Sequence, residues 1–268
     1  MKPSTMHLLS RSLLCRRALD AGVFIVHRSR EAKISRGAAC VPNTTGGKMA
    51  AEAEYADMWI NMWKDGILPG QRFDKTRAAP SLVRALEEGT LSVKNKRVLI
   101  PGCGRGYDVI LMAQHGATPA MGLDLVEDAV KAAEMYKDST DASNNVKARA
   151  WYTDGDFFKW TDEAGPFDVA YDYTFLCALQ PHDRKKWAQR YAQLIKPGGQ
   201  LATLIFPVDA SKDRNHGPPF PVTPELYADL LEPLGFARVY FREIEPHESH
   251  ERRQGQGYFA VWTLKPEA

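Results

Sequence analysis

The stretch RVLIPGCGRGYDVILMAQHGATPAMGLDL, residues 97–125, constrains the fold more than any other part of the chain. It begins with a short apolar run at 97–101, passes through a turn with three closely spaced glycines, and continues into a helix-like segment. A second apolar run at 119–125 follows and carries Asp124 near its end. An apolar strand, a glycine turn, a helix and a second strand make a βαβ unit, which requires parallel strands and a right-handed crossover.

The rest of the chain continues this alternation of strands and helices. Seven segments are predicted to be strands because they are short, apolar or alternating, and bounded by turn residues. The expected strands cover 97–101, 119–125, 148–158, 167–176, 200–208, 237–245 and 257–265, and the expected helices cover 57–66, 81–89, 107–116, 126–138, 182–199 and 223–235. The last two strands form a hairpin, which places one antiparallel strand in the sheet. We therefore expect an α/β fold with a doubly wound, seven-stranded, mostly parallel sheet.

Composition narrows the class of protein. The 268 residues are 44% hydrophobic and 25% charged, which is ordinary for a globular protein. The four cysteines are far apart and form no CxxC pair, which argues against a disulfide scaffold or a zinc site and fits a reducing compartment. No apolar run approaches the roughly 18 residues that a membrane span needs. We accordingly expect neither a metal centre nor a membrane span.

Basic residues are concentrated at the N-terminus. Residues 1–48 carry nine Arg and Lys against two acidic residues, a net charge of +7, whereas residues 49–268 carry 26 basic and 31 acidic residues, a net charge of −5. This mildly acidic body is unlike a nucleic-acid-binding protein, so we expect no nucleic-acid partner. The start is either a mitochondrial or plastid transit peptide or a disordered extension of a cytoplasmic protein. The single folded domain is then 49–268.

The glycine turn, with an acid at the end of the next strand, predicts a ligand site. Open parallel sheets bind ligands beyond the carboxyl ends of their strands, where Gly102 and Gly104 allow close approach and Asp124 can accept both hydroxyls of a ribose. Dinucleotides favour GxGxxG because the pyrophosphate lies on the helix N-terminus. Here Tyr107 occupies the third glycine position, and Asp108 would repel a pyrophosphate. The turn therefore fits S-adenosylmethionine, which carries no phosphate, better than NAD.

The third strand offers candidates for holding an adenine. In DGDFF, Asp156 can accept a hydrogen bond from the adenine amino group while Phe157 packs on the ring. Asp154 could serve instead, and either acid could be a turn residue. The terminal hairpin points the same way, since dehydrogenase domains with a similar sheet usually lack it.

Five segments occur in a characteristic order: GCGRGYD, DGDFF, FDVAYDYTFLCALQP, WAQRYAQLIKPGG and NHGPPFPV. With them the chain resembles the thiopurine S-methyltransferase superfamily, and within it the halide, thiol and thiocyanate methyltransferases of plants and microbes. The resemblance runs from about residue 59 to the C-terminus. It implies a Rossmann-like methyltransferase fold with S-adenosylmethionine as cofactor. It also implies cofactor contacts at Trp59, Trp63, Gly102, Asp124, Asp156, Phe157 and Tyr173.

The chain departs in two places from the pattern of the halide-methylating relatives, and both concern the acceptor. Those relatives typically read TPW after the tryptophan pair, where this chain has Leu68, Pro69 and Gly70. They often place a tyrosine at the end of strand five, where this chain has Phe206. A glycine at position 70 could enlarge the pocket for a larger oxygen, nitrogen or arsenic acceptor. A non-catalytic protein that binds S-adenosylmethionine is the other alternative.

A small soft nucleophile is the acceptor that best suits the predicted pocket. Iodide, thiocyanate, hydrosulfide or an aromatic thiolate arrives ionised near neutral pH and needs no dedicated base. The faces of Trp59, Trp63 and Tyr173 could support the sulfonium by cation–π contact. Phe73 and Phe206 could form an apolar wall that removes water from the nucleophile. We expect a small-molecule acceptor and a monomeric protein.

Other reactive side chains are expected to have structural roles. Cys103 and Cys177 are predicted to pack as small apolar residues rather than act as nucleophiles. Among the loop histidines, only His216 is a candidate for a substrate-binding loop. The run HESHERR, 247–253, is predicted to be a solvated loop.

Overall fold

The computed structural model describes the backbone of residues 44–266 and the side chains of residues 53–266. Most of the predicted extension 1–48 therefore lies outside the described residues. Its last positions belong to the first helix, α1 (Thr44–Lys64), which includes the helix expected at 57–66 but begins before Met49.

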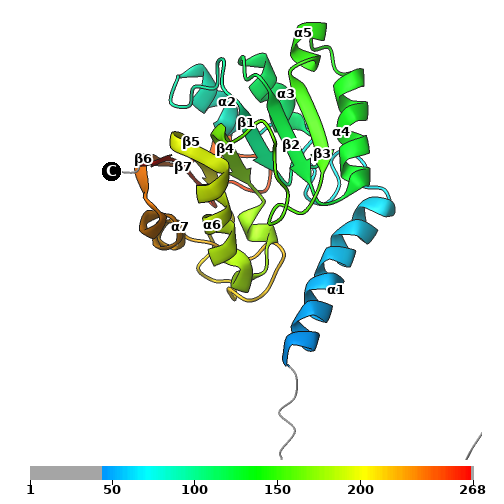
Figure 1. Cartoon of the computed structure of the whole chain (residues 1–268), viewed down its shortest axis with the longest axis vertical. Coiled ribbons are helices and arrows are strands. Elements are labelled where there is room, and N and C mark those ends of the chain that lie inside the picture. The colour runs from blue at the N-terminus through cyan, green and yellow to red at the C-terminus, as the bar shows by residue number, and fades with distance from the viewer. Residues whose placement is uncertain (1–43, 267–268) are drawn as a thin grey trace, which may run out of the picture. The chain divides into compact units, whose positions relative to one another are not determined.

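Seven strands form one sheet in the order β3-β2-β1-β4-β5-β7-β6 (Figure 1). The strands are β1 (Val98–Pro101), β2 (Ala120–Asp124), β3 (Ala150–Asp154), β4 (Phe167–Tyr173), β5 (Ile195–Ile205), β6 (Phe236–Glu243) and β7 (Tyr258–Leu264). Strand β7 is antiparallel to both of its neighbours, β5 and β6, and every other pair is parallel. The expected fold class, with a single antiparallel strand, is confirmed.

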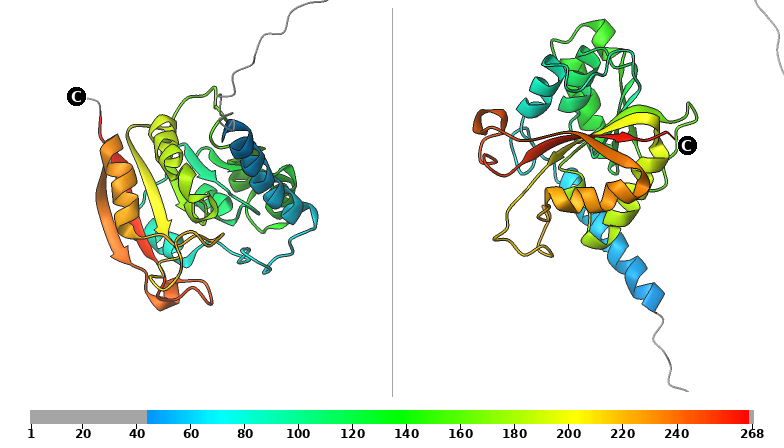
Figure 2. Two further views of the ribbon diagram at one scale, coloured as in Figure 1. Left: turned by 90° about the horizontal axis from the view of Figure 1, so that it is seen from below. Right: turned by 90° about the vertical axis from the view of Figure 1, so that its left-hand side faces the viewer.

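Helices cover both faces of this sheet. The helices after α1 are α2 (Pro80–Glu87), α3 (Tyr107–Gln114), α4 (Glu127–Ser139), α5 (Asn144–Lys147), α6 (Arg184–Leu194) and α7 (Pro224–Leu231). In the right-hand view of Figure 2, the teal and green helices α2 to α4 lie on one side of the sheet, and α6 and α7 lie on the other. This is the doubly wound arrangement that alternating strands and helices predict.

The core follows from the alternation of side chains along the central strands. In β4, Val169 and Tyr171 face the cluster that includes α2 and α3, while Ala170 faces the cluster formed with α6 and α7. The buried carboxylate of Asp172 lies on the α6 side and accepts hydrogen bonds from Trp187 Nε1 at 2.7 Å and Tyr191 Oη at 3.1 Å. The strand that leads to the predicted site is therefore held firmly on both faces.

Two sequence predictions of local structure are corrected. The helix expected at 182–199 ends at Leu194, because Ile195 already pairs with Phe167 of β4, and a register shift follows. The Pro-Gly-Gly sequence therefore lies inside β5 rather than at a helix end. The one-turn helix α5 was not predicted, since four residues are too few to show a helical period.

No helix within residues 44–266 combines the length and the apolar composition that crossing a bilayer requires.

Candidate functional site

A cavity of about 660 Å³ opens at the edge of the sheet where the parallel strands have their carboxyl ends. Its walls come from the residues that follow β1, β2, β4 and β5, from the segment between α1 and α2, and from the loop between β6 and β7. This is the edge at which an open parallel sheet binds its ligand. The cavity has two ends, which differ in the kind of groups that line them.

The glycine turn forms the floor of the first end. Gly102 has a φ of +61°, and a Cβ atom there would lie 2.7 Å from the ring of Phe175, so only glycine fits. Gly104 has a φ of +52° and donates its backbone N–H to Oδ2 of Asp124 at 2.9 Å. The turn thus exposes backbone to the cavity, as a closely bound ligand requires.

Asp124 lies at the end of β2, next to the turn, as predicted. It is only 8% exposed, and its Oδ1 accepts a hydrogen bond from the backbone N–H of Val126 at 3.2 Å. Burial raises the pKa of this carboxyl to about 6. The carboxylate faces the cavity with lone pairs left on both oxygens, which suits it to accept a pair of ligand hydroxyls.

Trp59 and Trp63 close the same end of the cavity, and Phe73, which was predicted as part of the apolar wall at the acceptor, packs on them. The backbone oxygen of Phe73 accepts a hydrogen bond from Arg253 Nη2 at 3.4 Å, so Phe73 lies where the two ends of the cavity meet. The ring of Phe73 lies with its centroid 5.7 Å from that of Trp59 and 5.8 Å from that of Trp63. Trp63 is buried and also packs with Val126 and Ala129. The tryptophans are therefore both core residues of the α1–α4 contact and a wall of the site.

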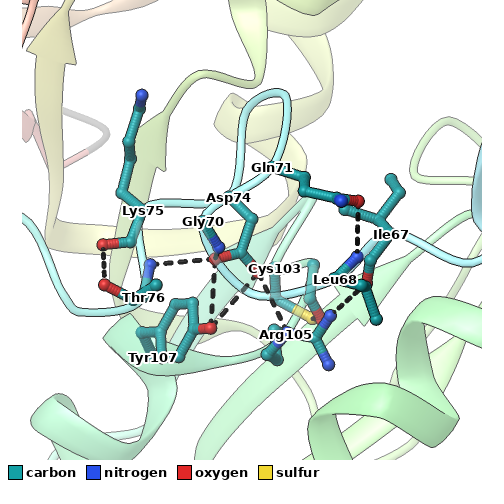
Figure 3. A network of polar contacts seen from close by, with 11 residues as sticks. Ile67, Leu68, Gly70, Gln71, Asp74, Lys75, Thr76, Cys103, Arg105 and Tyr107 are labelled. Carbon is teal, nitrogen blue, oxygen red and sulfur yellow. Dashed lines mark hydrogen bonds and ion pairs between the residues drawn. The ribbon is translucent and has the colours of Figure 1, made fainter.

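A buried polar network holds the loop that follows α1 against the glycine turn (Figure 3). Asp74 accepts hydrogen bonds from the backbone N–H groups of Gly70 at 3.1 Å and Thr76 at 2.8 Å. Its Oδ2 accepts from Arg105 Nε at 2.9 Å, and Tyr107 Oη donates to the same carboxylate. We call Asp74, Arg105 and Tyr107 the latch. Sequence reasoning missed it, because an aspartate in a Pro/Gly loop gives no signal of a partner some 30 residues away.

The other end of the cavity carries an arginine on an aromatic wall. Arg253 donates a hydrogen bond to Tyr173 Oη, and its guanidinium carbon lies 4.7 Å from the ring centroid of Phe206 and 5.4 Å from that of Tyr173. His250 stacks on Tyr173 with ring centroids 6.1 Å apart. Burial lowers the pKa of His250 to about 4, so this imidazole is neutral at physiological pH. We call Tyr173, Phe206 and Arg253 the acceptor wall.

The prediction that 247–253 is a solvated loop holds only for the exposed positions His247, Glu251 and Arg252. His250 is 4% exposed and Glu248 is 3% exposed. The Glu248 carboxylate forms ion pairs with Arg84 of α2 and Arg242 of β6, which ties the loop to the body. A run rich in His, Glu and Arg resembles a solvent-exposed segment, and the sequence holds no sign that its partners lie in distant elements.

Asp156 and Phe157, predicted to contact the adenine, are not part of the cavity wall among the described residues. Asp156 accepts from Phe158 N at 2.9 Å and pairs with Lys159 at 2.9 Å, as a turn residue does. Phe157 is buried, and its ring centroid lies 5.0 Å from that of Phe175, which does line the cavity. Their adenine-binding role stays a prediction.

The remaining candidates have structural surroundings. Burial raises the pKa of the Cys103 and Cys177 thiols, so both are protonated at neutral pH and pack as small apolar groups. His216 is exposed, outside the cavity wall. Gly70 has a φ of +84° and also lies outside the wall, so its small size serves the turn rather than the pocket. Within the described part of the chain, no group of three or more His, Cys, Asp or Glu side chains is arranged to hold a metal ion.

A seven-stranded sheet with β7 as its single antiparallel strand, and a cavity between a glycine turn and an acid at the end of β2, make up the Rossmann-like fold of methyltransferases. Solved structures of methyltransferases share this fold. An S-adenosylmethionine-dependent methyltransferase from Methanosarcina mazei superimposes with a TM-score of 0.56 at 18% identity, covering 68% of this chain and 98% of that one.

Sequence comparison is more specific. The chain belongs to the thiopurine S-methyltransferase family, whose pattern matches residues 54–261, and it is thus an S-adenosylmethionine-dependent methyltransferase. It is 34% identical over 239 residues to thiocyanate methyltransferase 1 of Brassica oleracea, covering 89% of this chain and 98% of the relative. It is 40% identical over 181 residues to probable thiol methyltransferase 2 of Arabidopsis thaliana, covering 68% of this chain and 74% of the relative. The resemblance inferred from the motifs is confirmed.

Proposed function

We propose that the protein transfers the methyl group of S-adenosylmethionine to a small soft nucleophile: a thiol, hydrosulfide, thiocyanate or a halide. The names of the relatives from Brassica oleracea and Arabidopsis thaliana support this acceptor class. The observation that carries the proposal is the placement of Arg253 on the aromatic acceptor wall, in the same cavity as Gly102 and Asp124. Among the described residues no carboxylate forms an ion pair with this guanidinium, so its charge is available to an anionic acceptor.

The residues present fit the cofactor. At Gly102 a Cβ atom would clash with the Phe175 ring, so the glycine lets the turn pass close to the cavity with its backbone exposed, and Asp124 presents a buried carboxylate at the end of β2. When bound, S-adenosylmethionine supplies an electrophilic methyl group on a sulfonium. The faces of Trp59, Trp63 and Tyr173 can support that cation at about 2 kcal/mol when water is excluded.

The chain's contribution to the reaction is mainly alignment and desolvation. The acceptor wall holds an anion by the charge of Arg253 while Tyr173 and Phe206 exclude water from it. Fixing two reactants in line for displacement is worth roughly 7–11 kcal/mol. Polarizable anions are favoured because they give up their hydration most easily in such an apolar site.

A panel assay tests the acceptor class. Purified protein with methyl-labelled S-adenosylmethionine is given chloride, iodide, thiocyanate, hydrosulfide, an aryl thiol, a phenol, an amine and arsenite. We expect turnover with thiocyanate, hydrosulfide and thiols, and less with chloride. A best acceptor among the phenol, the amine and arsenite would support the larger-acceptor alternative, and tight cofactor binding without turnover would support a non-catalytic protein.

Cofactor identity is tested separately by calorimetry. We expect S-adenosylhomocysteine to bind and NAD(H) to give no measurable heat, because Tyr107 and Asp108 replace the features of a pyrophosphate site. Binding of NAD(H) alone would contradict the proposed activity at its first step.

We further propose that the protein works as a monomer in the cytoplasm. Sedimentation of the purified chain tests the first point. Fluorescent fusions with and without residues 1–48 test the second, and import that depends on these residues would favour a mitochondrion or a plastid instead.

A further inference from the structure

Three carboxylates face the cavity, and they differ in how many hydrogen bonds they accept from the protein. The Asp74 carboxylate accepts from four donors of the loop and the latch. Asp124 accepts from two backbone N–H groups beside the glycine turn. Asp108, at the start of α3, accepts one hydrogen bond within the described part of the chain, from Ala79 N to its Oδ1 at 3.1 Å. Its second oxygen is left for a group in the cavity.

Asp108 lies near the acceptor wall. Ala79, to which it is bonded, lines a small pocket of about 10 Å³ together with Tyr173, Phe206 and Arg253. The charge of Asp108 also contributes to raising the pKa values of Tyr171, Tyr173 and Cys103, after the larger effect of burial on each. This carboxylate therefore faces the end of the cavity where the acceptor is expected.

The second observation is a hydroxyl without a partner. Tyr171 is fully buried in β4 and lines the cavity, and its Oη makes no hydrogen bond to any described residue. A buried hydroxyl without a partner is costly, and it is rare in folded proteins unless a ligand or ordered water completes it. The unpaired hydroxyl of Tyr171 thus indicates that a polar atom of a ligand binds at the floor of the same cavity.

We propose that Asp108, with Tyr171 beside it, is the proton acceptor for neutral thiol substrates of this enzyme. This inference rests on the proposed function and divides its substrates into two groups. Thiocyanate and halides carry no proton and need only the acceptor wall. An alkyl thiol is mostly protonated at neutral pH, like the side chain of cysteine, and must lose its proton before or during methyl transfer.

The step balances as follows. The S–H bond of the thiol breaks, and its proton passes to the free oxygen of the Asp108 carboxylate. The sulfur electron pair forms the new bond to the methyl carbon, while the methyl–sulfonium bond breaks and leaves its electron pair on S-adenosylhomocysteine. Asp108 then releases the proton to solvent. Arg253 stabilises the thiolate, and Tyr171 can donate its hydrogen bond to the carboxylate or to the sulfur.

Electrostatics suit this role. Burial raises the pKa of Asp108 to about 6, partly offset by the Ala79 hydrogen bond, so the group is ionised at pH 7 yet basic enough to take a proton. The titratable groups that face it are Tyr171 and Tyr173 from β4 and Cys103 from the glycine turn, all with raised pKa values and therefore neutral. Arg253 reaches the same region through its contact with Tyr173.

The test compares two substrates on one variant. We would measure kcat/KM of the wild type and of Asp108→Asn with 2-mercaptoethanol and with thiocyanate from pH 6 to 9. At pH 7 we expect the variant to lose about 100-fold with the thiol, in the range of general-base effects, and less than threefold with thiocyanate. The thiol rate of the variant should rise about tenfold per pH unit, and that of the wild type much less steeply.

Other outcomes overturn the inference. An equal loss with both substrates would mean that Asp108 holds the cofactor or the fold, and no loss with either would leave it without a catalytic role. The pH dependence of the wild-type thiol rate tests the inference without any variant. If its thiol rate alone rises tenfold per pH unit up to the thiol pKa, no group on the enzyme accepts the proton.

Tyr171→Phe supplies a second variant. We expect its thiol rate to fall by less than that of Asp108→Asn and its thiocyanate rate to stay near the wild type. Wild-type protein that methylates neither substrate would contradict the proposed function itself, which is a different result from a failure of the proton-acceptor role.

Discussion

The two ends of the cavity are held in place by different kinds of contact. At the cofactor end, the backbone N–H of Gly104 in the glycine turn donates to Asp124, and the latch binds the neighbouring loop through Asp74. At the acceptor end, three side chains from separate elements meet, and Arg253 is held by Tyr173 and by contact with aromatic rings. The first end is fixed by hydrogen bonds over short stretches of chain, and the second depends on how distant loops pack.

The difference implies that the two ends can be changed independently. Substitutions at the cofactor end should alter binding of S-adenosylhomocysteine and the stability of the fold. Substitutions at the acceptor end should alter kcat/KM for the acceptor and leave cofactor binding unchanged. Both expectations can be measured on the same purified variants.

The largest effect is expected at the latch, from Asp74→Ala. This change leaves Arg105, whose side chain is 13% exposed, without its carboxylate partner. Removing one member of a buried pair costs about 3–5 kcal/mol, so we expect the free energy of unfolding in urea to fall by that order. Affinity for S-adenosylhomocysteine should fall as well, because the loop carrying Phe73 is released from the glycine turn.

Asp65→Ala is the matched control for the latch, since Asp65 is an exposed acid at the start of the same segment. It should leave both the unfolding free energy and the affinity close to the wild type. Equal behaviour of the two variants would show that the loop stays on the turn without Asp74, and that the cofactor end is not held by the latch.

Arg253→Met should affect the acceptor end alone. Losing a charge-assisted hydrogen bond costs about 1.5–3 kcal/mol, so we expect kcat/KM for thiocyanate to fall by a factor of about 10–100. Calorimetry should find unchanged affinity for S-adenosylhomocysteine. Arg252, which is exposed and lines the same cavity without a contact to the aromatic rings of the acceptor wall, is changed to Met as the control and should cost less than threefold. A similar loss in both variants would assign the effect to general positive charge at the cavity mouth.

The pH dependence of cofactor binding probes Asp124. Burial raises the pKa of this carboxyl, so below about pH 6 the free protein holds a proton there and offers fewer acceptors to ligand hydroxyls. Affinity for S-adenosylhomocysteine should be constant from pH 7 to 8.5 and should weaken by up to tenfold per pH unit below 6. Asp108→Asn should keep this decline and Asp124→Asn should lack it, which separates the two groups of similar pKa.

The same contrast explains what the sequence could predict. Gly102, Gly104 and Asp124 lie within one βαβ unit, where a strand, a turn and the next strand specify their own geometry, and the structure brings them together as expected. The seven strands and the antiparallel β7 were also predictable, because each strand is short, apolar and bounded by turn residues. Local patterns are therefore enough for the sheet and for the glycine turn with Asp124, but not for the latch.

Long-range partners were not predictable. The 247–253 segment reads as solvent-exposed, yet Glu248 pairs with Arg84, which is 164 residues away in the chain. Asp74, in the loop between α1 and α2, pairs with Arg105 of the glycine turn, 31 residues further along the chain. Such pairs leave no periodicity or motif in a single sequence. Of the acceptor wall, which depends on the loop that Glu248 holds, the sequence predicted Tyr173 as a cofactor contact and Phe206 as part of an apolar wall, and it gave no sign of Arg253.

The smallest effect is expected from Phe206→Tyr, which adds one hydroxyl at the acceptor end. Phe206 is 8% exposed, and its ring lies under the Arg253 guanidinium, so the new group would enter a desolvated site beside a positive charge. A hydroxyl there can donate to a small, hard anion and compensate its lost hydration, whereas a large polarizable anion gains less. One net hydrogen bond is worth about 0.5–1.5 kcal/mol, so the ratio of kcat/KM for chloride to that for iodide should rise by a factor of about 2–10. Phe73→Tyr adds the same hydroxyl to a ring that packs on Trp59 and Trp63, and it should shift this ratio less. If both variants shift the ratio equally, the acceptor contacts both aromatic walls, and the division of the cavity into two ends does not hold for its smallest ligands.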